Sequence, residues 1–518
     1  MTSSSTPAHA HAGPPDTKLD RHVLMVAGVV VLGAIMSILD VTVVAVAQNT
    51  FQQEFNTDAA GAAWTATGYT LALAAVIPLS SWAASRFGTK KVYLTSLVLF
   101  ILGSVLCALA WNIGSLVAFR VIQGLGGGML MPIGMMILTK AAGPERVGSV
   151  MAVLGIPMLL GPIGGPILGG LLIEKASWHW VFLINVPIGI AALVYSWIVL
   201  RDDDETSRPK IDIVGLLLLS PGLALFLFGI SSSAEHRTFM TGSVLIPAII
   251  GAILIVGFVW HALHTDKPLL DLRLFRNRTL SIAVVTMTLF MIAFFGAALL
   301  FPQYFIGVRG ESTLTAGLLL APQGLGAMLT MPIAGRMTDK IGPGKFVLTG
   351  IVLLLAGMSV FVFVGAETSY LLLCGALFVQ GLGMGMTMMP IMSAALATLN
   401  NAQVPDGSTL MNVVQQSSSS IGSAVISVVL ASGLAGSMQA GLAITSNTAP
   451  QNLPPELQGA PVPTSFFESA ADVFGSTFLV SVVLIALTFI PALFLPRKKI
   501  ASPLIEEDMD KPSPIIMH

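Results

Sequence analysis

The chain has 518 residues, of which 54% are hydrophobic and only 10% are charged. An ordinary soluble domain carries about 25% charged residues, so this composition excludes a soluble protein and predicts a polytopic membrane protein. The net charge of −1 provides no basic surface for nucleic acid. Both cysteines, Cys107 and Cys374, lie inside apolar runs, where neither a structural disulfide nor a metal site is expected.

Residues 1–21 are predicted to form a disordered cytoplasmic tail, because they are polar and poor in large apolar side chains. The tail does not resemble a signal peptide, since no short apolar stretch is followed by a small-residue cleavage site. His9 and His11 could bind a metal, but two histidines in a polar tail are more often incidental. We therefore expect no metal site.

Fourteen apolar runs follow this tail, each long enough to cross the roughly 30 Å core of a bilayer as a helix. The predicted fold class is an all-α integral membrane protein with 14 transmembrane helices. Their expected positions are 23–48, 62–84, 92–110, 113–138, 148–173, 181–200, 212–231, 242–263, 279–302, 313–335, 346–365, 370–396, 408–434 and 474–495.

The positive charges predict how these helices are oriented. Of the 25 Lys and Arg residues, only Lys175, Arg237 and Arg309 lie in predicted outer segments, and Arg120 lies inside the membrane. The other 21 lie in predicted inner segments, which follows the positive-inside rule. With an even number of helices, both termini are then cytoplasmic.

Two pairs of similar segments indicate an internal duplication. RVIQGLGGGMLMPIG in the fourth predicted helix resembles LFVQGLGMGMTMMPIM in the twelfth, and SRFGTKK after the second helix resembles TDKIGPGK after the tenth. Two six-helix halves in the same orientation, separated by two inserted helices, explain the common offset of eight helices. The predicted parts are an N-terminal half at 22–200, an insert at 201–264, a C-terminal half at 265–497 with a long outer loop at 435–472, and a cytoplasmic tail at 498–518.

Two charges stand alone inside the predicted helices, Asp40 in the first and Arg120 in the fourth. An ionisable side chain at bilayer depth is costly, so it persists where it is paired or lines a water-filled route. At 1.5 Å per residue, Asp40 lies roughly 26 Å from the inner start of its helix and Arg120 roughly 10 Å from the outer start of its own. The two depths agree within about one turn. The pair is then either a proton or ion site or a structural ion pair.

The fifth predicted helix is dense in glycine and proline, with the segment GIPMLLGPIGGPILGG at 155–170. Glycine at this density allows a neighbouring backbone to approach closely, and proline allows the helix to bend. A tightly packed, kinked helix follows directly from this pattern, and a pivot or seal between the halves is the functional reading. The candidate positions are Gly161, Pro162, Gly164, Gly165 and Gly169.

These motifs together resemble the fourteen-helix drug:proton antiporter family of the major facilitator superfamily. The similar segments are ILDVTVVAVA at 38–47, LVAFRVIQG at 116–124, GPIGGPILGG at 161–170 and WHWVFLINVPIG at 178–189. The resemblance extends over about residues 22–497. It implies that Asp40 handles protons or cations and that Arg120 and Gln123 occupy positions associated with proton coupling.

The resemblance also implies a cytoplasmic gate built from the two loop motifs. In the first copy Ser81 and Ser85 stand where the family has Gly and Asp, and the positions that follow the pattern are Arg86, Gly88, Lys90 and Lys91. The second copy keeps the family residues at Gly335, Asp339 and Gly342. Since the first copy lacks its carboxylate, we expect the gate to depend more on the second copy. The alternative is that the loop charges only set the topology.

Carboxamide side chains inside the predicted helices either join neighbouring helices or line a substrate cavity. The candidates are Gln123, Gln323, Gln380, Asn412, Gln415 and Gln416. Asp406, near the inner end of the thirteenth helix, is expected to be a surface residue. SFFESAADVF, at 465–474 in the outer loop, is expected to form a short amphipathic helix.

The sequence therefore predicts a proton-coupled multidrug efflux antiporter that exports hydrophobic or cationic compounds by alternating access. The alternative is a dedicated exporter of one metabolite, lipid or siderophore on the same scaffold. A membrane enzyme is not favoured, because the sequence offers no paired intramembrane acids, Ser–His set or metal-ligand cluster. A sensor without transport would leave the lone buried acid unexplained.

The expected partners are lipophilic small molecules, protons and the lipid bilayer, with no nucleic acid and with the proton gradient in place of a cofactor. The expected location is the inner or plasma membrane of a bacterial cell. Some members of the family work with a periplasmic adaptor protein. The sequence leaves open whether this chain needs one, and it leaves the oligomeric state open as well.

Overall fold

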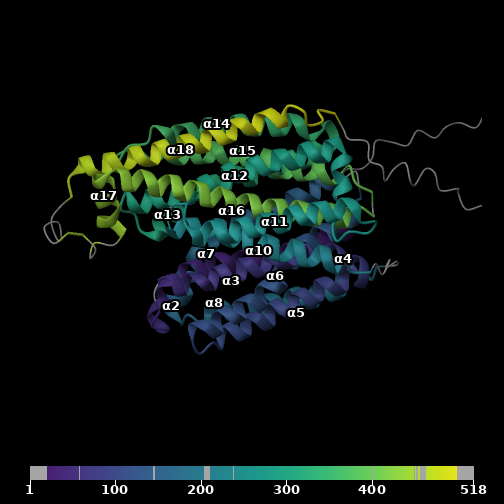
Figure 1. Ribbon diagram of the computed structural model, residues 1–518. Helices are drawn as coiled ribbons and strands as arrows, with labels where there is room; N and C mark the ends of the chain where they lie inside the picture. The colour runs from purple at the N-terminus through teal and green to yellow at the C-terminus, as the bar shows by residue number, and fades with distance from the viewer. Residues whose placement is uncertain are drawn as a thin grey trace, which may run out of the picture.

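The computed structural model describes residues 20–57, 59–143, 146–203, 210–236, 238–400, 402–448, 450, 453–454 and 462–498. Over these residues the chain is helical and has no strand, and the long helices lie side by side in one bundle (Figure 1). The all-α membrane fold expected from the composition is confirmed. Most of the two predicted tails, 1–21 and 498–518, lies outside the described residues.

The helices follow the order expected for two halves and an insert. The first half contains α1 (Arg21–Val46), α2 (Gln48–Glu54), α3 (Ala59–Val76), α4 (Leu79–Phe87), α5 (Thr89–Ala108), α6 (Ile113–Ala142), α7 (Val147–Lys175), α8 (Trp180–Leu183) and α9 (Asn185–Val199). The insert forms α10 (Ile213–His236) and α11 (Gly242–His264). The second half contains the 3-10 helix η2 (Leu272–Arg276), α12 (Arg278–Gly307), α13 (Thr313–Ile341), α14 (Pro343–Val362), α15 (Tyr370–Leu396), α16 (Val404–Gly436), α17 (Met438–Thr448) and α18 (Thr464–Ala492).

Both ends of the described chain lie at the same end of the bundle, which we call the terminal side. Asp20, just before α1, pairs with Arg146 at the start of α7, with Nη1 and Oδ2 3.1 Å apart. Asp339, near the end of α13, accepts backbone hydrogen bonds from the first turn of the same α7. Next to it, Gly344 donates from its backbone N–H to the carbonyl of Pro496, after α18. The opposite end, which we call the far side, carries α2, α8 and α17 (Figure 1).

The helices are long and apolar enough to cross a bilayer. Among the described residues twelve helices meet this condition, and α3 together with α4 would make a thirteenth span. The predicted fifth span, 148–173, is also helical, as α7. Each predicted span thus coincides with helical residues, while the number of membrane crossings stays a prediction.

The second predicted helix, 62–84, is wrong as a single segment. The chain bends by 56° between α3 and α4. Pro78 explains the bend, because it lacks a backbone N–H and its ring crowds the preceding turn. The Ser80 hydroxyl donates to the carbonyl of Ile77 and so satisfies an acceptor at the break.

The predicted outer loop, 435–472, is more helical than expected. It contains α17, which is not among the predicted helices, and the segment 465–474 is the beginning of α18 and not a separate short helix. Ala470, Ala471 and Phe474 are fully or almost fully buried, so this segment packs on the bundle and extends the last span.

The duplicated GLG motif produces duplicated packing. On α6, a Cβ atom at Gly126 would lie 2.6 Å from the backbone nitrogen of Phe100 on α5. On α15, a Cβ atom at Gly383 would lie 2.5 Å from the carbonyl oxygen of Gly350 on α14. Both distances are too short for any side chain, so glycine sets the separation of each helix pair. The other face of α6 packs on α3, and that of α15 packs on α13.

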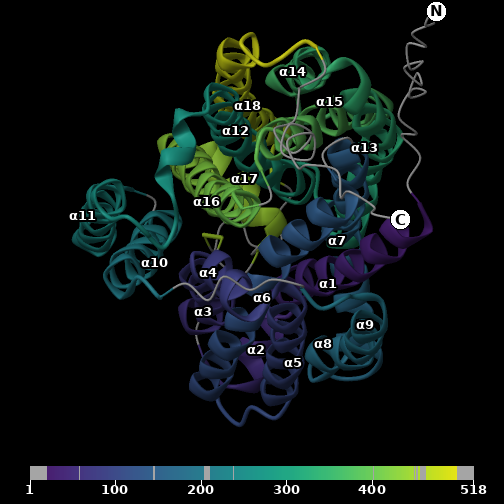
Figure 2. The same ribbon diagram turned by 90° about the vertical axis from the view of Figure 1, so that its right-hand side faces the viewer.

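The inserted helices contact both halves from one side of the bundle. α10 packs on α11, on α3 of the first half and on α16 of the second, and Figure 2 shows the pair α10 and α11 set apart from the other helices. The rings of Trp64 and Phe228 lie 5.5 Å apart at the α3 contact. Asp212, which lies just before α10, accepts hydrogen bonds from the backbone N–H groups of Gly215 and Leu269.

Candidate functional site

Asp40 on α1 and Arg120 on α6 form a buried ion pair. The distance between Arg120 Nη1 and Asp40 Oδ2 is 2.5 Å, and the side chains are only 1% and 0% exposed, respectively. The structure thus brings together the two charges whose predicted depths agree. A buried pair of this kind needs further hydrogen bonds, because the mutual attraction alone rarely offsets the loss of hydration.

Carboxamide donors satisfy the second oxygen of Asp40. Gln123 Nε2 lies 2.8 Å from Asp40 Oδ1, and Asn185 Nδ2 lies 2.9 Å from the same oxygen. Gln123 also donates to Ser104 Oγ at 2.7 Å, which ties α5 to the pair. Asn185 is missing from the predicted candidates, although it is the one carboxamide in the predicted span 181–200. A carboxamide inside an apolar span is the signal that identifies it, as for the glutamines.

Arg120 has partners besides Asp40. Its Nε donates to the backbone carbonyl of Thr65 at 3.0 Å, and its Nη1 donates to Gln123 Oε1 at 2.6 Å. The guanidinium lies over the ring of Tyr69, 4.2 Å from the centroid, in a cation–π contact. Arg120 therefore stays anchored by α3 and α6 when the charge of Asp40 changes.

Aromatic rings cover the ion pair toward the far side. The ring centroid of Phe182, in α8, lies 5.8 Å from the guanidinium of Arg120. The ring stacks on Phe51 of α2 at 6.0 Å and meets Trp178 edge to face at 6.3 Å. This apolar cover separates the charges from the water expected at the far side.

A cavity of about 320 Å³ lies between the halves, bounded by α1, α3, α6, α12 and α16. Its size falls at the lower end of the range typical of small-molecule sites. Among the described residues that line it, none is charged, and the polar ones include Ser37, Thr42, Asn412, Gln415 and Gln416. We call it the central cavity.

The structure places the predicted carboxamides in three different environments. Asn412, Gln415 and Gln416 line the central cavity, which is the arrangement expected if these carboxamides contact a substrate. Gln123 belongs to the ion-pair network and is fully buried. Gln323 and Gln380 lie outside the lining of the central cavity, and Gln380 donates to the sulfur of Met358 at 3.7 Å.

The second loop motif joins the two halves on the terminal side. Asp339 of α13 accepts hydrogen bonds from the backbone N–H groups of Gly148 and Ser149, at 2.8 and 3.0 Å. A carboxylate at the start of α7 is favoured by the helix dipole. A Cβ atom at Gly335 would lie 2.5 Å from the carbonyl of Gly148, so α7 and α13 touch through their backbones here.

The remaining gate candidates contact their own half. Gly88 and Gly342 have φ values of +88° and +91°, which favour glycine at both repeated turns. Lys90 Nζ lies 3.8 Å from Asp202 Oδ1, so the chain after α9 packs on the turn that contains Gly88. Gly342 packs in the same way on the backbone of Lys498, after α18. Arg86 is in the last turn of α4.

The first loop motif reaches the other half through a residue that was expected at the surface. Ser81 of α4 donates a hydrogen bond to Asp406 in the first turn of α16. Asp406 is partly buried, so its prediction as a surface residue is wrong. Asp339 of the second copy accepts three hydrogen bonds from the first turn of α7, so the expectation that the gate depends more on the second copy stays a prediction. The carboxylate missing from position 85 is replaced by one on the opposite helix.

The glycine-rich helix α7 lies between the halves. A Cβ atom at Gly161 would lie 2.0 Å from Ile38 Cγ2, and one at Gly165 would lie 2.0 Å from Thr42 Oγ1, both on α1. Gly164 and Gly169 face the same helix, at 3.7 and 3.2 Å. The side chain of Pro162 lies outside the described residues. α7 also touches α13 of the opposite half. The same helix therefore contacts both the region of α1 around Asp40 and the second half.

Comparisons with known proteins identify the family. Residues 30–423 match the family model of the Major Facilitator Superfamily. The chain belongs to the Major Facilitator Superfamily. As a member of this superfamily it is similar to "Multidrug resistance protein B homolog" of Mycobacterium tuberculosis (strain ATCC 25618 / H37Rv), with 46% identity over 96% of this chain and 94% of that protein.

Two further similar proteins illustrate the range of relatives. "Putative multidrug resistance protein MdtD" of Yersinia enterocolitica is 33% identical over 78% of this chain and 85% of that protein. Among solved structures, the human organic anion transporter MFSD10 (TETRAN) matches with a TM-score of 0.59 and 16% identity, over 91% of this chain and 100% of that one. At this identity the likeness concerns the fold alone, which is that of a superfamily transporter.

Asn185→Leu should weaken this transporter at the ion pair. The change removes a hydrogen-bond donor from the buried Asp40 carboxylate, which we expect to cost about 1–3 kcal/mol of stability. Proton-driven transport should fall by about tenfold. Thermal unfolding in detergent and transport in liposomes measure the two effects. Tyr195→Phe on the same helix α9 is the control, because it also loses one hydrogen bond, to the carbonyl of Met25 at 3.2 Å. Equal transport loss in both variants would contradict a special role of Asn185.

Ser81→Ala should open the terminal side more often, because it removes a hydrogen bond to a carboxylate between α4 and α16. Such a bond contributes about 1.5–3 kcal/mol, which corresponds to a shift of about tenfold or more between closed and open populations. Distances between spin labels on the terminal-side ends of α4 and α16 measure this shift. Ser85→Ala is the matched control, and it should leave the distance distribution unchanged. If the two variants behave alike, the Ser81–Asp406 contact does not hold the gate.

Proposed function

We propose that this protein is a proton-driven exporter of hydrophobic small molecules that works by alternating access between its two halves. The observation that carries the proposal is a buried acid–base pair beside a cavity between the halves. Ser37 lines that cavity and lies one helical turn from Asp40 on α1. The names of the relatives, which describe multidrug resistance proteins, support the same function.

The proposal includes fourteen membrane crossings with both termini in the cytoplasm. The excess of Lys and Arg in the terminal-side segments supports this orientation. The terminal side is then the cytoplasmic side, where Asp339 and the Ser81–Asp406 contact hold α7, α13, α4 and α16 together. The structure corresponds in this proposal to a state that is closed toward the cytoplasm.

The proton acts on Asp40. In the state open to the outside, a proton from the medium binds a carboxylate oxygen of Asp40, and the carboxyl group becomes neutral. Arg120 then loses its ionic partner but keeps the carbonyl of Thr65 and the side-chain oxygen of Gln123. In the state open to the cytoplasm, the proton leaves, the ion pair reforms, and the protein can bind the next substrate. The proton gradient supplies the energy, and no cofactor takes part.

Tyr69 connects the central cavity with the ion pair. Its hydroxyl oxygen lies 3.2 Å from Ser37 Oγ, and Ser37 lines the cavity. Its ring covers the guanidinium of Arg120. A substrate that displaces Ser37 would therefore disturb Tyr69 and, through it, the partner of Asp40. This gives substrate and proton a physical route by which each can weaken the binding of the other.

Asp40→Asn should abolish transport driven by a pH gradient. The variant cannot release a proton at this position, so we expect a loss of at least tenfold. The assay is a pH jump across liposomes that contain the purified protein, with a panel of lipophilic cations, neutral amphiphiles and lipids. Asp472→Asn, an exposed acid on α18, is the control and should retain transport. A panel in which one compound alone is transported would instead favour a dedicated exporter.

Because Asp40→Asn leaves Arg120 buried without an ionic partner, this variant could lose about 3–5 kcal/mol of stability. The double variant Asp40→Asn, Arg120→Met removes both charges and separates folding from coupling. We expect it to fold and to bind substrate without a response to pH. Full pH-driven transport by Asp40→Asn or by the double variant would rule out Asp40 as the proton site.

Tyr69→Phe should uncouple substrate from proton while keeping the ring over Arg120. We expect substrate affinity within about threefold of the original value and a loss of at least half of the protons released when substrate binds. Proton release is measured with a pH indicator in weakly buffered detergent solution. Tyr93→Phe is the control, because Tyr93 is equally buried but donates to the carbonyl of Val29 away from the pair. Unchanged proton release in Tyr69→Phe would contradict this role.

A further inference from the structure

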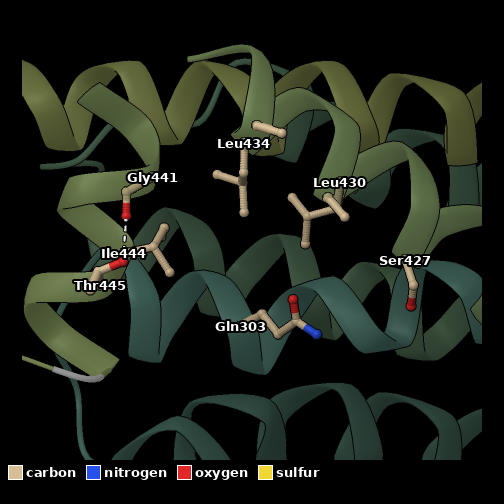
Figure 3. A pocket seen from close by; sticks show the side chains of 9 residues that line it. Gln303, Ser427, Leu430, Leu434, Gly441, Ile444 and Thr445 are labelled. Carbon is tan, nitrogen blue, oxygen red and sulfur yellow. Dashed lines mark hydrogen bonds between the residues drawn. The ribbon is translucent and has the colours of Figure 1, made fainter. Parts of the chain in front are cut away.

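A second cavity lies on the far-side end of the C-terminal half. Its volume is about 530 Å³, and it is bounded by α12, the last turns of α16, and α17. Figure 3 shows Gln303 of α12 on one wall, Leu430 and Leu434 of α16 on the opposite wall, and Ile444 of α17 at one end. We call it the outer cavity.

Two helices carry both cavities. Phe295 of α12 lines the central cavity and Gln303 lines the outer one, while Ser419 and Ser427 do the same on α16. Each pair is eight residues apart, which places the outer cavity roughly 12 Å closer to the far side. The two cavities thus lie one after the other along the same helix pair.

A line of polar side chains on α16 joins them. Its members recur at intervals of three or four residues, which puts them on one face of the helix. The line starts at the central cavity and ends at the outer cavity, and its members are Asn412, Gln416, Ser419, Ser423 and Ser427. Asn412 is buried and the other four are partly exposed, so packing against neighbouring helices does not seal this face of α16.

The outer cavity offers hydrogen bonds without charge. Among the described residues that line it, none is charged. The carboxamide of Gln303 and the hydroxyl of Ser427 make no hydrogen bond within the described part of the chain, so both are available to a ligand. Thr445 differs, because its hydroxyl donates to the carbonyl of Gly441 at 2.8 Å (Figure 3). Leucine and isoleucine side chains supply the remaining apolar surface.

The helix α17 is fixed over this space. Asn447 donates from Nδ2 to the carbonyl of Gly307, at the end of α12, with a distance of 2.9 Å. A Cβ atom at Gly307 would lie 2.8 Å from Ile444 Cδ1, so the two helices meet closely at this point. α17 therefore forms a fixed wall at one end of the outer cavity, which is open to the surface beside the exposed Gln303.

We propose that the outer cavity is an exit site, in which an uncharged amphiphilic substrate with hydrogen-bonding groups binds after it leaves the central cavity. This inference rests on the export function proposed above. The central cavity, which also lacks charged lining residues, selects the same class of compound. The line of polar side chains on α16 gives the substrate hydrogen-bonding partners between the two sites.

Gly441→Leu tests the exit site by filling it. Gly441 lines the outer cavity, and a Cβ atom there would meet only the carbonyl oxygen of Leu434 at 3.6 Å, which is ordinary contact. Gly436→Leu is the matched control, because a Cβ atom at Gly436 has nothing within 4 Å and the residue does not line the cavity. The probe is Nile red, an uncharged lipophilic dye, with tetraphenylphosphonium as a charged comparison.

We expect Gly441→Leu to lower the rate of pH-driven Nile red efflux from liposomes by about fivefold or more. The affinity for Nile red in detergent, which reports the central cavity, should stay within about twofold. Gly436→Leu should match the original protein in both assays. Gln303→Leu removes a hydrogen-bonding group without filling the space, and it should also lower the rate of Nile red efflux.

Other outcomes separate the two proposals. If the original protein moves neither probe in either direction under a pH gradient, the export function itself fails. If it exports Nile red and Gly441→Leu does so at the same rate, the exit site alone is overturned. Loss of a bound phospholipid in Gly441→Leu, seen by mass spectrometry with unchanged efflux, would assign the cavity to lipid. Faster transport of tetraphenylphosphonium than of Nile red would overturn the uncharged substrate class.

Discussion

The ion pair between Asp40 and Arg120 is the constraint on which the rest of the site depends. Two charges at this depth are tolerated because both oxygens of Asp40, and Nε and Nη1 of Arg120, have hydrogen-bond partners on the helices around them. The partners are unequal. Arg120 has neutral acceptors and an aromatic ring in addition to Asp40, whereas Asp40 depends on donors that favour its charged form. A single proton can therefore change one member of the pair while the other keeps its place.

The two halves share a backbone plan but not this chemistry. Leu377 on α15 stands at the repeat position of Arg120, and Gln380 stands at that of Gln123. Gln123 donates to a serine on α5, while Gln380 donates to a methionine on α14, and its side-chain oxygen lacks a partner within the described chain. In place of charges the second half has clustered phenylalanine rings from α12, α14 and α18, 4.9–5.2 Å apart. The proton chemistry that we propose would thus belong to the first half alone.

The sequence predicts features that depend on composition or on a local pattern. The helical membrane fold, the duplication and the lone charges belong to this group, and the charges could be paired because their depths follow from helix geometry. The contact between Ser81 and Asp406 could not be predicted, because its partners are 325 residues apart and meet only when the halves dock. The bend at Pro78 could be predicted from the chemistry of proline, but the hydropathy of the segment does not indicate it. The cavities depend on side-chain packing between helices, which no linear pattern specifies.

The position of α10 makes the two flanks of the bundle different. Because α10 packs on α3 and on α16, it covers the boundary between the halves along one flank of the bundle. In the proposed transport cycle α10 would keep acyl chains from that boundary, whereas on the opposite flank α7 and α13 meet directly. Any rocking of the halves must also slide one of them along α10. In that cycle the insertion is therefore a surface along which one half has to move.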